Sequence, residues 1–305
     1  MNLEQDLLGA RFQNPVLLAS GTCGYGRELD GLIDLDTLGG LVIKAVTPEP
    51  REGNPPPRVA EYGAGMINSV GLANVGLERV ATEKLPWLAA RLRRAQVLVN
   101  VAGRSIEDYV RVIERLDPEP GFLGFELNLS CPNVKEGGAA FSTREDLLAE
   151  VIRAARAATR RPLIAKLAPN VPDIGRMAEV AVDAGADALT LINTFPGLLF
   201  DIETRRPLVG AGAGGVSGPA ILPMGVYAVW RARQRVRVPI LGAGGVRSGA
   251  DVLQYLLAGA SLVQVGTALF SDPRTPERVL TELGRYARRQ GVTDIREWIG
   301  AGVVS

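Results

Sequence analysis

Eight short apolar runs recur along the chain, and their alternation with helical patterns constrains the fold more than any other feature. Continuous apolar strands separated by amphipathic helices are typical of a parallel sheet whose outer face is covered by those helices. Eight strands in a chain of 305 residues predict an α/β fold, a (β/α)8 TIM barrel that forms a single domain over residues 1–305. The runs are PVLLAS ending at residue 20, LVIKAV at 41–46, VLVNV at 97–101, FLGFELNLS at 122–130, LIAKLA at 163–168, ALTLIN at 188–193, VPILGAGG at 238–245 and LVQVGT at 262–267.

The helical segments carry start signals that support this alternation. Ser105, Thr143 and Ser248 each precede an acidic residue by three positions and open a stretch with helical periodicity. A serine or threonine at such a position can cap the N-terminal turn, so we expect helices to begin at these residues. An open doubly wound sheet is the alternative, but its usual nucleotide fingerprint is a glycine-rich loop after the first strand with an acid closing the second, which SGTCGYG matches poorly. The pattern therefore favours the barrel.

Polar residues and glycines gather at the carboxyl ends of the apolar runs. The active sites of TIM barrels lie at this end of the strands. Any single one of these residues could serve only its own loop. Together they predict a site in the barrel mouth, with extended loops over the C-terminal face. The set comprises Ser20, Lys44, Asn100, Asn128 with Cys131 just beyond it, Lys166, Asn193, Thr194, Gly244, Gly245, Gly266 and Thr267.

Lysine is rare in this chain, which otherwise uses arginine for positive charge. Lys44 and Lys166 lie within apolar runs, where an unpaired ammonium would be unfavourable. We therefore expect both to face an anionic or electron-rich ligand. Lys84 and Lys135 lie outside the apolar runs, and we expect them to be solvated.

Two further features predict what surrounds the mouth. The segments GAGGVRSG and VGTAL provide small residues through which backbone N–H groups can approach a phosphate near the last two strands. The connections at 47–75, 131–142 and 195–218 are too long for plain turns, and long structured loops on one rim usually cover a ligand. We expect the third to form two extended arms around a turn, as a flap or a partner surface.

Composition argues against several classes of function. A net charge of +1 gives no argument for nucleic acid or an anionic membrane as a partner. No apolar run approaches the roughly 20 residues of a spanning helix and the first residues lack a signal-peptide layout, so we expect a cytoplasmic protein. Because there is no histidine, any proton transfer must use another side chain. The two cysteines, Cys23 and Cys131, are expected to be free thiols in a reducing compartment.

On these residues the chain resembles the dihydroorotate dehydrogenases, and specifically the class 1B catalytic subunits. The likeness covers nearly the whole chain, and the SCPNVK loop together with INT is its most specific part. The KEGG ending of that loop resembles class 1B rather than the fumarate-using class 1A. The segment NSVGLAN departs from the family pattern at Ser69 and Ala73. The resemblance therefore assigns substrate contacts to these two side chains less firmly than to the rest of the segment. The motifs are NPVLLASGT, VIKA, PPPRVAEYGAGMINSVGL, NVAG, LNLSCPNVKEGG, AKLAPNV, LINT, GGVSGPAI, GAGGV and VGTAL.

The resemblance implies an activity. Members bind FMN in the barrel mouth and oxidise dihydroorotate to orotate in pyrimidine biosynthesis, with a proton leaving C5 and a hydride moving from C6 to flavin N5. The base of class 1 members is a cysteine, which assigns that role to Cys131, flanked by Asn128 and Asn133. Cys23 matches no functional position and is expected to be a small buried residue.

The resemblance also assigns the other site residues. Lys166 is expected beside flavin N1 and O2, where its charge would stabilise the reduced ring, and Lys44 is expected to meet both substrate and flavin. The FMN site is expected to comprise Ser20, Lys44, Ala45, Asn100, Asn128, Lys166, Ile192, Gly218, Gly244, Gly245, Gly266 and Thr267. The substrate site is expected to comprise Lys44, Asn68, Ser69, Val70, Gly71, Leu72, Asn128, Asn193 and Thr194.

Class 1B members pass electrons to NAD through a second subunit that carries FAD and a 2Fe–2S cluster, around a homodimer core within a heterotetramer. Two cysteines cannot supply the four ligands that such a cluster generally takes, so NAD reduction by this chain would need that partner. Other functions stay open at this point. They are a Schiff-base aldolase or decarboxylase that uses Lys166, a non-catalytic scaffold that docks a redox partner, and a flavin enzyme acting on a dihydropyrimidine or dihydrouridine.

Overall fold

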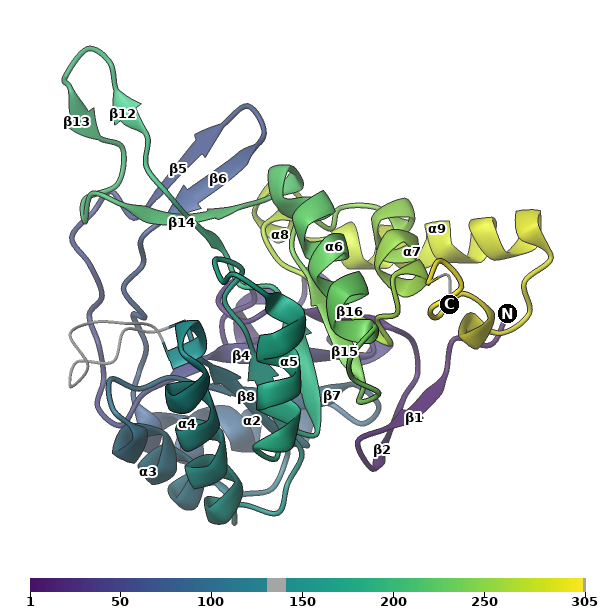
Figure 1. Cartoon of the computed structure of the whole chain (residues 1–305), viewed down its shortest axis with the longest axis horizontal. Helices are drawn as coiled ribbons and strands as arrows, with labels where there is room; N and C mark the ends of the chain where they lie inside the picture. The colour runs from purple at the N-terminus through teal and green to yellow at the C-terminus, as the bar shows by residue number, and fades with distance from the viewer. Residues whose placement is uncertain (131–140, 304–305) are drawn as a thin grey trace.

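The computed structural model describes residues 1–130 and 141–303, and within them it confirms the predicted (β/α)8 barrel (Figure 1). The strands close in the order β10-β15-β16-β3-β4-β7-β8-β9, and their neighbours run parallel. Each of the eight apolar runs coincides with one barrel strand. These strands are β3 (Val16–Leu18), β4 (Gly40–Val46), β7 (Gln96–Val101), β8 (Gly124–Asn128), β9 (Leu163–Lys166), β10 (Ala188–Leu191), β15 (Ile240–Ala243) and β16 (Leu262–Val265).

Helices surround the barrel, and two of the three predicted starts are confirmed. The Ser105 hydroxyl accepts from the Asp108 N–H, and the Ser248 hydroxyl accepts from the Asp251 N–H. The helices are α1 (Leu77–Arg79), α2 (Leu85–Arg91), α3 (Ile106–Leu116), α4 (Glu145–Ala158), α5 (Ile174–Asp183), α6 (Leu222–Arg233), α7 (Gly249–Leu257), α8 (Ala268–Ser271) and α9 (Thr275–Gln290). Shorter turns are the 3-10 segments η1 (Arg27–Leu29), η2 (Leu35–Thr37), η4 (Phe141–Thr143), η5 (Pro219–Ile221) and η6 (Ile295–Glu297), and the π segment η3 (Val80–Lys84).

The predicted helix start at Thr143 is wrong. Helix α4 begins at Glu145 with Arg144 in the N-cap position, because residues Phe141–Thr143 form a separate 3-10 turn. The Phe141 ring is fully buried and meets the Tyr109 ring edge to face at 5.5 Å. Burial of this aromatic ring fixes the turn ahead of the helix, an effect that a local capping pattern cannot register.

Side chains alternate between the barrel interior and the helical shell, as the pleat of a strand requires. In β8, Phe125 and Leu127 belong to the main core outside the barrel, whereas the Glu126 and Asn128 side chains make their contacts inside it. The lower interior is apolar, and Phe12 from the hairpin of β1 (Gln5–Leu7) and β2 (Ala10–Phe12) packs against it. The other members of this lower cluster are Leu17, Val42, Leu98, Ile164, Ala188, Leu241 and Leu262.

Two of the long connections meet in one four-stranded sheet. Strands β5 (Val59–Tyr62) and β6 (Gly65–Asn68) come from the first connection, and β11 (Phe195–Gly197) and β14 (Gly214–Ser217) from the third. They pair in the order β11-β14-β6-β5. The hairpin of β12 (Phe200–Asp201) and β13 (Arg206–Pro207) projects beyond them at the upper left of Figure 1. The predicted pair of extended arms around a turn is therefore confirmed.

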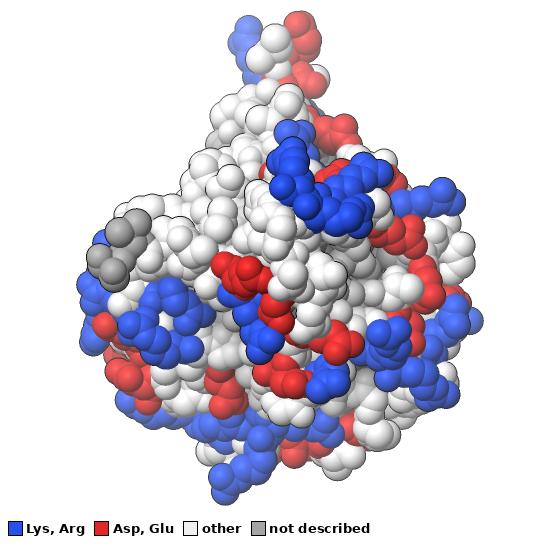
Figure 2. Space-filling model, turned by 90° about the vertical axis from the view of Figure 1, so that its right-hand side faces the viewer, with Lys and Arg blue, Asp and Glu red and all other residues white. Residues whose placement is uncertain are grey.

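The surface carries charges of both signs. On the face in Figure 2, Lys and Arg side chains alternate with Asp and Glu and do not gather into one basic patch. Within residues 1–130 and 141–303, no helix combines the length and the apolar character that crossing a bilayer would require.

Candidate functional site

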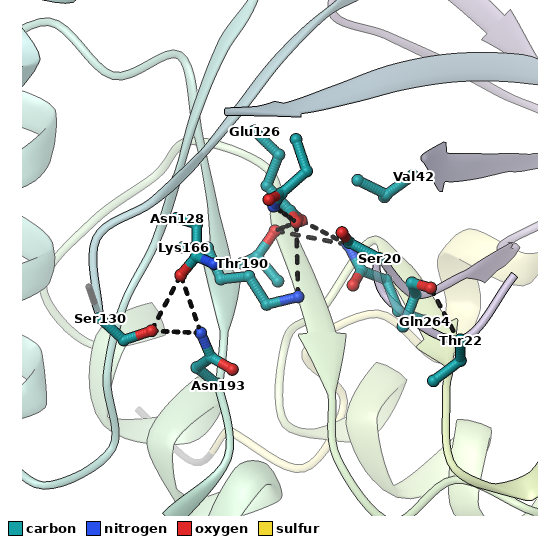
Figure 3. Close-up of polar contacts among 12 residues, drawn as sticks. Ser20, Thr22, Val42, Glu126, Asn128, Ser130, Lys166, Thr190, Asn193 and Gln264 are labelled. Carbon is teal, nitrogen blue, oxygen red and sulfur yellow. Dashed lines mark hydrogen bonds and ion pairs between the residues drawn. The ribbon is translucent and has the colours of Figure 1, made fainter. Parts of the chain in front are cut away.

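The carboxyl ends of β8 and β10 bring together a cluster of polar side chains in the barrel mouth (Figure 3). The Asn193 amide donates to Asn128 Oδ1 at 3.1 Å and also contacts the Ser130 hydroxyl, which donates to Asn128 Oδ1 at 2.9 Å. The Tyr109 hydroxyl donates to the Asn128 carbonyl at 2.6 Å, and Asn193 Oδ1 accepts from the Thr194 N–H at 2.8 Å. The structure thus joins Asn128, Asn193 and Thr194, three residues predicted to hold the substrate or the cofactor.

Below this cluster, Glu126 forms the centre of a buried polar layer. Its Oε1 atom accepts from Asn100 Nδ2 at 2.8 Å and lies 3.4 Å from Lys166 Nζ. Its Oε2 atom accepts from Thr190 Oγ1 at 2.7 Å and from Gln264 Nε2 at 2.8 Å. These five side chains come from five different barrel strands. Lys166 therefore does face an anionic group, but the nearest one belongs to the protein itself.

Lys44 extends from β4 on the other side of the mouth. Its side chain is partly exposed and has no hydrogen-bond or ion-pair partner within residues 1–130 and 141–303. Next to it, the Ser20 hydroxyl donates to the Ile43 carbonyl at 2.9 Å. Ala45 is buried and packs with Ala102 and with Leu72 of the substrate loop. An unpaired ammonium in the mouth is available to an anionic ligand.

The predicted substrate loop follows β6 and is held by its neighbours in the four-stranded sheet. The Asn68 amide donates to the Gly215 carbonyl of β14 at 3.1 Å. The Ser69 hydroxyl accepts from Asn54 Nδ2 at 2.8 Å, so this side chain is engaged within the loop. The Val70 carbonyl accepts from the Asn54 N–H at 3.1 Å, and Gly71 and Leu72 adopt positive φ values of 70° and 57°.

Glycines lie in the mouth at the carboxyl ends of β15 and β16. Gly244 and Gly245 follow β15 with φ values of 116° and 76°, and a Cβ on Gly245 would lie 2.6 Å from the Leu222 side chain. The Tyr255 hydroxyl lies 2.9 Å from the Ala243 carbonyl and 2.7 Å from the Gly244 carbonyl and fixes this turn. The other predicted members, Ile192, Gly218, Gly266 and Thr267, lie just beyond β10, β14 and β16. Backbone N–H groups in such a turn can approach a phosphate closely.

Two buried acceptor atoms lack a partner among the described residues, Asn100 Oδ1 and Gln264 Oε1. Buried polar atoms are normally hydrogen-bonded, so unpartnered acceptors at the floor of a mouth suit a ligand that carries an N–H donor. The ring of FMN carries one, its phosphate suits the glycine turns, and Lys44 can meet an acidic substrate. The residues present therefore fit the cofactor that the resemblance implies.

Several predictions concern residues outside this mouth. Cys131, Asn133 and Lys135 lie outside the described residues. Cys23 is a buried free thiol whose sulfur lies 3.2 Å from the Val42 carbonyl, and burial raises its pKa to about 12. The expectation that Lys84 is solvated is wrong, because its side chain is only 20% exposed and its ammonium lies 5.6 Å from the centre of the Tyr25 ring.

Sequence reasoning missed Glu126, Thr190 and Gln264. A signal was available, because Glu126 is the one acidic residue within the eight apolar runs. A lysine buried in one strand requires an acceptor from another, and in a barrel the inward positions of different strands meet. Thr190 and Gln264 likewise occupy inward positions of their strands, two residues beyond the apolar Ala188 and Leu262.

Known proteins resemble this chain over nearly its full length. The dihydroorotate dehydrogenase family matches residues 2–286. A protein of Solibacter usitatus provisionally named dihydroorotate dehydrogenase A (fumarate) is 50% identical, over 98% of this chain and 97% of its own. The dihydroorotate dehydrogenase B (NAD(+)) catalytic subunits of Desulforudis audaxviator and Geotalea daltonii are 48% and 45% identical, over 97% and 98% of this chain and 95% and 98% of their own.

Proposed function

Because the chain belongs to the dihydroorotate dehydrogenase family, we propose that its barrel mouth oxidises dihydroorotate to orotate, a step of pyrimidine biosynthesis, with FMN as the bound cofactor. The observation that carries this proposal is the family match across the barrel, together with the joining of Asn128, Asn193 and Lys166 at its mouth. Schiff-base chemistry on Lys166 and a silent scaffold would both leave the Asn128 and Asn193 amides without a task.

The protein groups divide between substrate and cofactor. Bound FMN supplies the hydride acceptor for C6 of the substrate. Cys131 removes the proton from C5, and Lys44 pairs with the substrate carboxylate. The amides of Asn128 and Asn193 both donate and accept, which suits the alternating carbonyl and N–H groups of the pyrimidine ring. Asn68, Ser69, Val70, Gly71, Leu72 and Thr194 complete the substrate site.

Backbone groups and the two lysines of the mouth would hold the cofactor. Lys166 lies on the floor, where its ammonium would stabilise negative charge on a reduced cofactor ring. The turns after β15 and β16 would hold the phosphate through N–H groups. The remaining contacts come from Ser20, Lys44, Ala45, Asn100, Asn128, Ile192, Gly218, Gly244, Gly245, Gly266 and Thr267.

The electrons leave through a partner. The relatives named as B-type catalytic subunits support a chain that works with a second subunit, which we propose carries FAD and a 2Fe–2S cluster and reduces NAD. We place the chain in a homodimer core within a heterotetramer in the cytoplasm. The A-type name of another relative makes the acceptor a point for direct measurement.

The absorption spectrum of the purified chain tests the activity directly. Under anaerobic conditions we expect a flavin band that bleaches when dihydroorotate is added and returns when an artificial acceptor dye is supplied. A dihydropyrimidine without the carboxylate serves as the control and should leave the band unchanged. A chain without a flavin band, or a band that dihydroorotate does not bleach, would overturn the proposal.

A further inference from the structure

The buried layer around Glu126 has a composition that barrel packing alone does not explain. Glu126 is the only fully buried carboxylate, and Lys166 the only buried ammonium, within residues 1–130 and 141–303. The interior of a TIM barrel is normally filled by branched apolar side chains. The layer beneath, which contains Val42, Leu98 and Ile164, is of that kind.

A buried ion pair is a weak source of stability. Moving a carboxylate and an ammonium out of water is unfavourable, and apolar residues of similar volume are often as stabilising or more so. The pair of Glu126 and Lys166 is therefore poorly explained as a structural device. A buried charge at the floor of the proposed active site therefore indicates a functional role for the charge itself.

The hydrogen bonds define which form of Glu126 the layer accommodates. The Asn100 amide, the Gln264 amide and the Lys166 ammonium direct donors at the carboxylate, and the Thr190 hydroxyl adds another. An ionised carboxylate is an acceptor on both oxygens, so four donors suit the charged form. Glu126 thus places one negative charge 3.4 Å from the ammonium that lies on the floor of the mouth.

The layer is also incomplete within the protein. While the amide nitrogens of Asn100 and Gln264 bind Glu126, their carbonyl oxygens are buried without partners among the described residues. If this hydrogen-bond network only stabilised the barrel, each of its buried polar atoms would be expected to have a hydrogen-bond partner within the protein. In Figure 3, Lys166 lies between this layer and the cluster of Asn128, Ser130 and Asn193, so the layer connects directly to the site.

We propose that Glu126 is a positioning residue that holds Lys166 at the floor of the mouth and sets the reduction potential of the bound FMN through its buried negative charge. The inference rests on the proposed function, since it needs FMN in this mouth. Glu126 offsets part of the Lys166 charge, so the cofactor gains electrons less readily than it would above an unpaired lysine. Loss of the carboxylate therefore raises the potential.

The midpoint potential of the bound FMN tests this assignment, measured by spectroelectrochemical titration without substrate. In Glu126→Gln we expect the equilibrium constant for reduction to rise roughly tenfold to a hundredfold, since charges near a buried site interact strongly. This corresponds to about +30 to +60 mV for a two-electron couple. Glu126→Asp keeps the charge and should shift the potential less. Glu114→Gln removes the same charge from the exposed face of α3 and should leave the potential unchanged.

Each outcome separates this inference from the activity. A wild-type chain that is bleached by dihydroorotate, with a Glu126→Gln variant of unchanged potential, would overturn the role of Glu126 and leave the proposed function intact. A wild-type chain that binds no FMN overturns both. If Glu126→Gln fails to fold, wild-type protein with carbon-13 glutamate is reduced chemically and compared by infrared difference spectroscopy. We expect a label-sensitive carboxylate band, and its absence would overturn the inference.

Discussion

The thiol of Cys23 lies in the first loop of the barrel, covered on all sides. Burial raises its pKa from 9.0 to about 12, so at any pH below this range the neutral thiol dominates. Since the thiolate is the reactive form, this rise in the pKa leaves roughly a thousandfold less thiolate at a given neutral pH. Cys131, not Cys23, is therefore the thiol that we propose as the base.

Thiol titration checks this difference. In native Cys131→Ser protein at pH 8 we expect Cys23 to react with an aromatic disulfide reagent at least a hundredfold more slowly than in the same protein unfolded in urea. The unfolded variant supplies the control, because it should release one equivalent rapidly. Rapid modification of the native variant would contradict the buried placement of Cys23.

The role of Cys131 as the base has its own kinetic signature. Replacement by serine should slow flavin reduction by dihydroorotate by roughly 10² to 10⁴-fold while the FMN band stays, since general-base catalysis contributes about this much. An ordinary thiol pKa of about 8.5 predicts that the wild-type rate rises between pH 7 and pH 9. Stopped-flow absorbance measures both effects. Cys23→Ala is the matched control and should keep the rate, whereas loss of FMN from Cys131→Ser would assign the residue a structural part.

Single residues were predictable wherever their chemistry stands out in the sequence. Lys166 was identified because a charge within an apolar run requires a partner, and the structure places one 3.4 Å away. The partner itself was missed, because Glu126 lies 40 positions earlier and only barrel closure brings the two strands together. Lys84 was misjudged for a similar reason, since its contact with the Tyr25 ring joins segments far apart in sequence.

At the level of elements, the sheet of β5, β6, β14 and β11 couples two connections that both carry residues of the proposed substrate site. Gly215 of β14 lies opposite Asn68 of β6 in the ladder and accepts a hydrogen bond from its side chain. A Cβ on Gly215 would lie 2.2 Å from the Thr194 hydroxyl oxygen. One backbone position thus controls the placement of two predicted substrate contacts.

Gly215→Ala tests this coupling. The added methyl group must displace Thr194, and since misplacement of about 1 Å can be severe for a bound substrate, we expect the KM for dihydroorotate to rise roughly tenfold or more. The FMN content should remain that of the wild type, because the glycine turns after β15 and β16 are untouched. Steady-state kinetics with a dye acceptor measures KM.

Gly63→Ala is the matched control for this variant. Gly63 lies in the turn between β5 and β6, and a Cβ there would meet nothing within 4 Å. We expect its kinetics to equal those of the wild type. An unchanged KM in Gly215→Ala would mean that Thr194 does not contact the substrate.

The eight barrel strands were predictable because each is a continuous apolar run, and burial on both faces dictates that pattern whatever the surroundings. The four-stranded sheet was not, because its pairing joins Asn68 to Gly215 across 147 positions and its strands are rich in glycine. Helix starts were predictable only in part. The serines at 105 and 248 act locally, whereas burial of Phe141 overrides the local signal at Thr143.

At the scale of the whole molecule, the hairpin of β12 and β13 ends in an apolar tip that lies outside the proposed active site. Phe200 is 55% exposed and Ile202 is 85% exposed on the hairpin of β12 and β13. Large exposed apolar side chains on a projecting hairpin are typical of protein–protein contact. They support a catalytic chain that works in an assembly.

The electron acceptor that the chain can reduce depends on that assembly. The chain has two cysteines, too few for a 2Fe–2S cluster, so the purified chain should contain FMN but no iron. With dihydroorotate it should reduce a dye, which is the control for an intact active site, but should reduce NAD at no measurable rate. Addition of the FAD and iron–sulfur subunit should restore NAD reduction. Rapid turnover of fumarate by the chain alone would instead assign it the acceptor of the A-type relative, and the partner subunit would then be unnecessary.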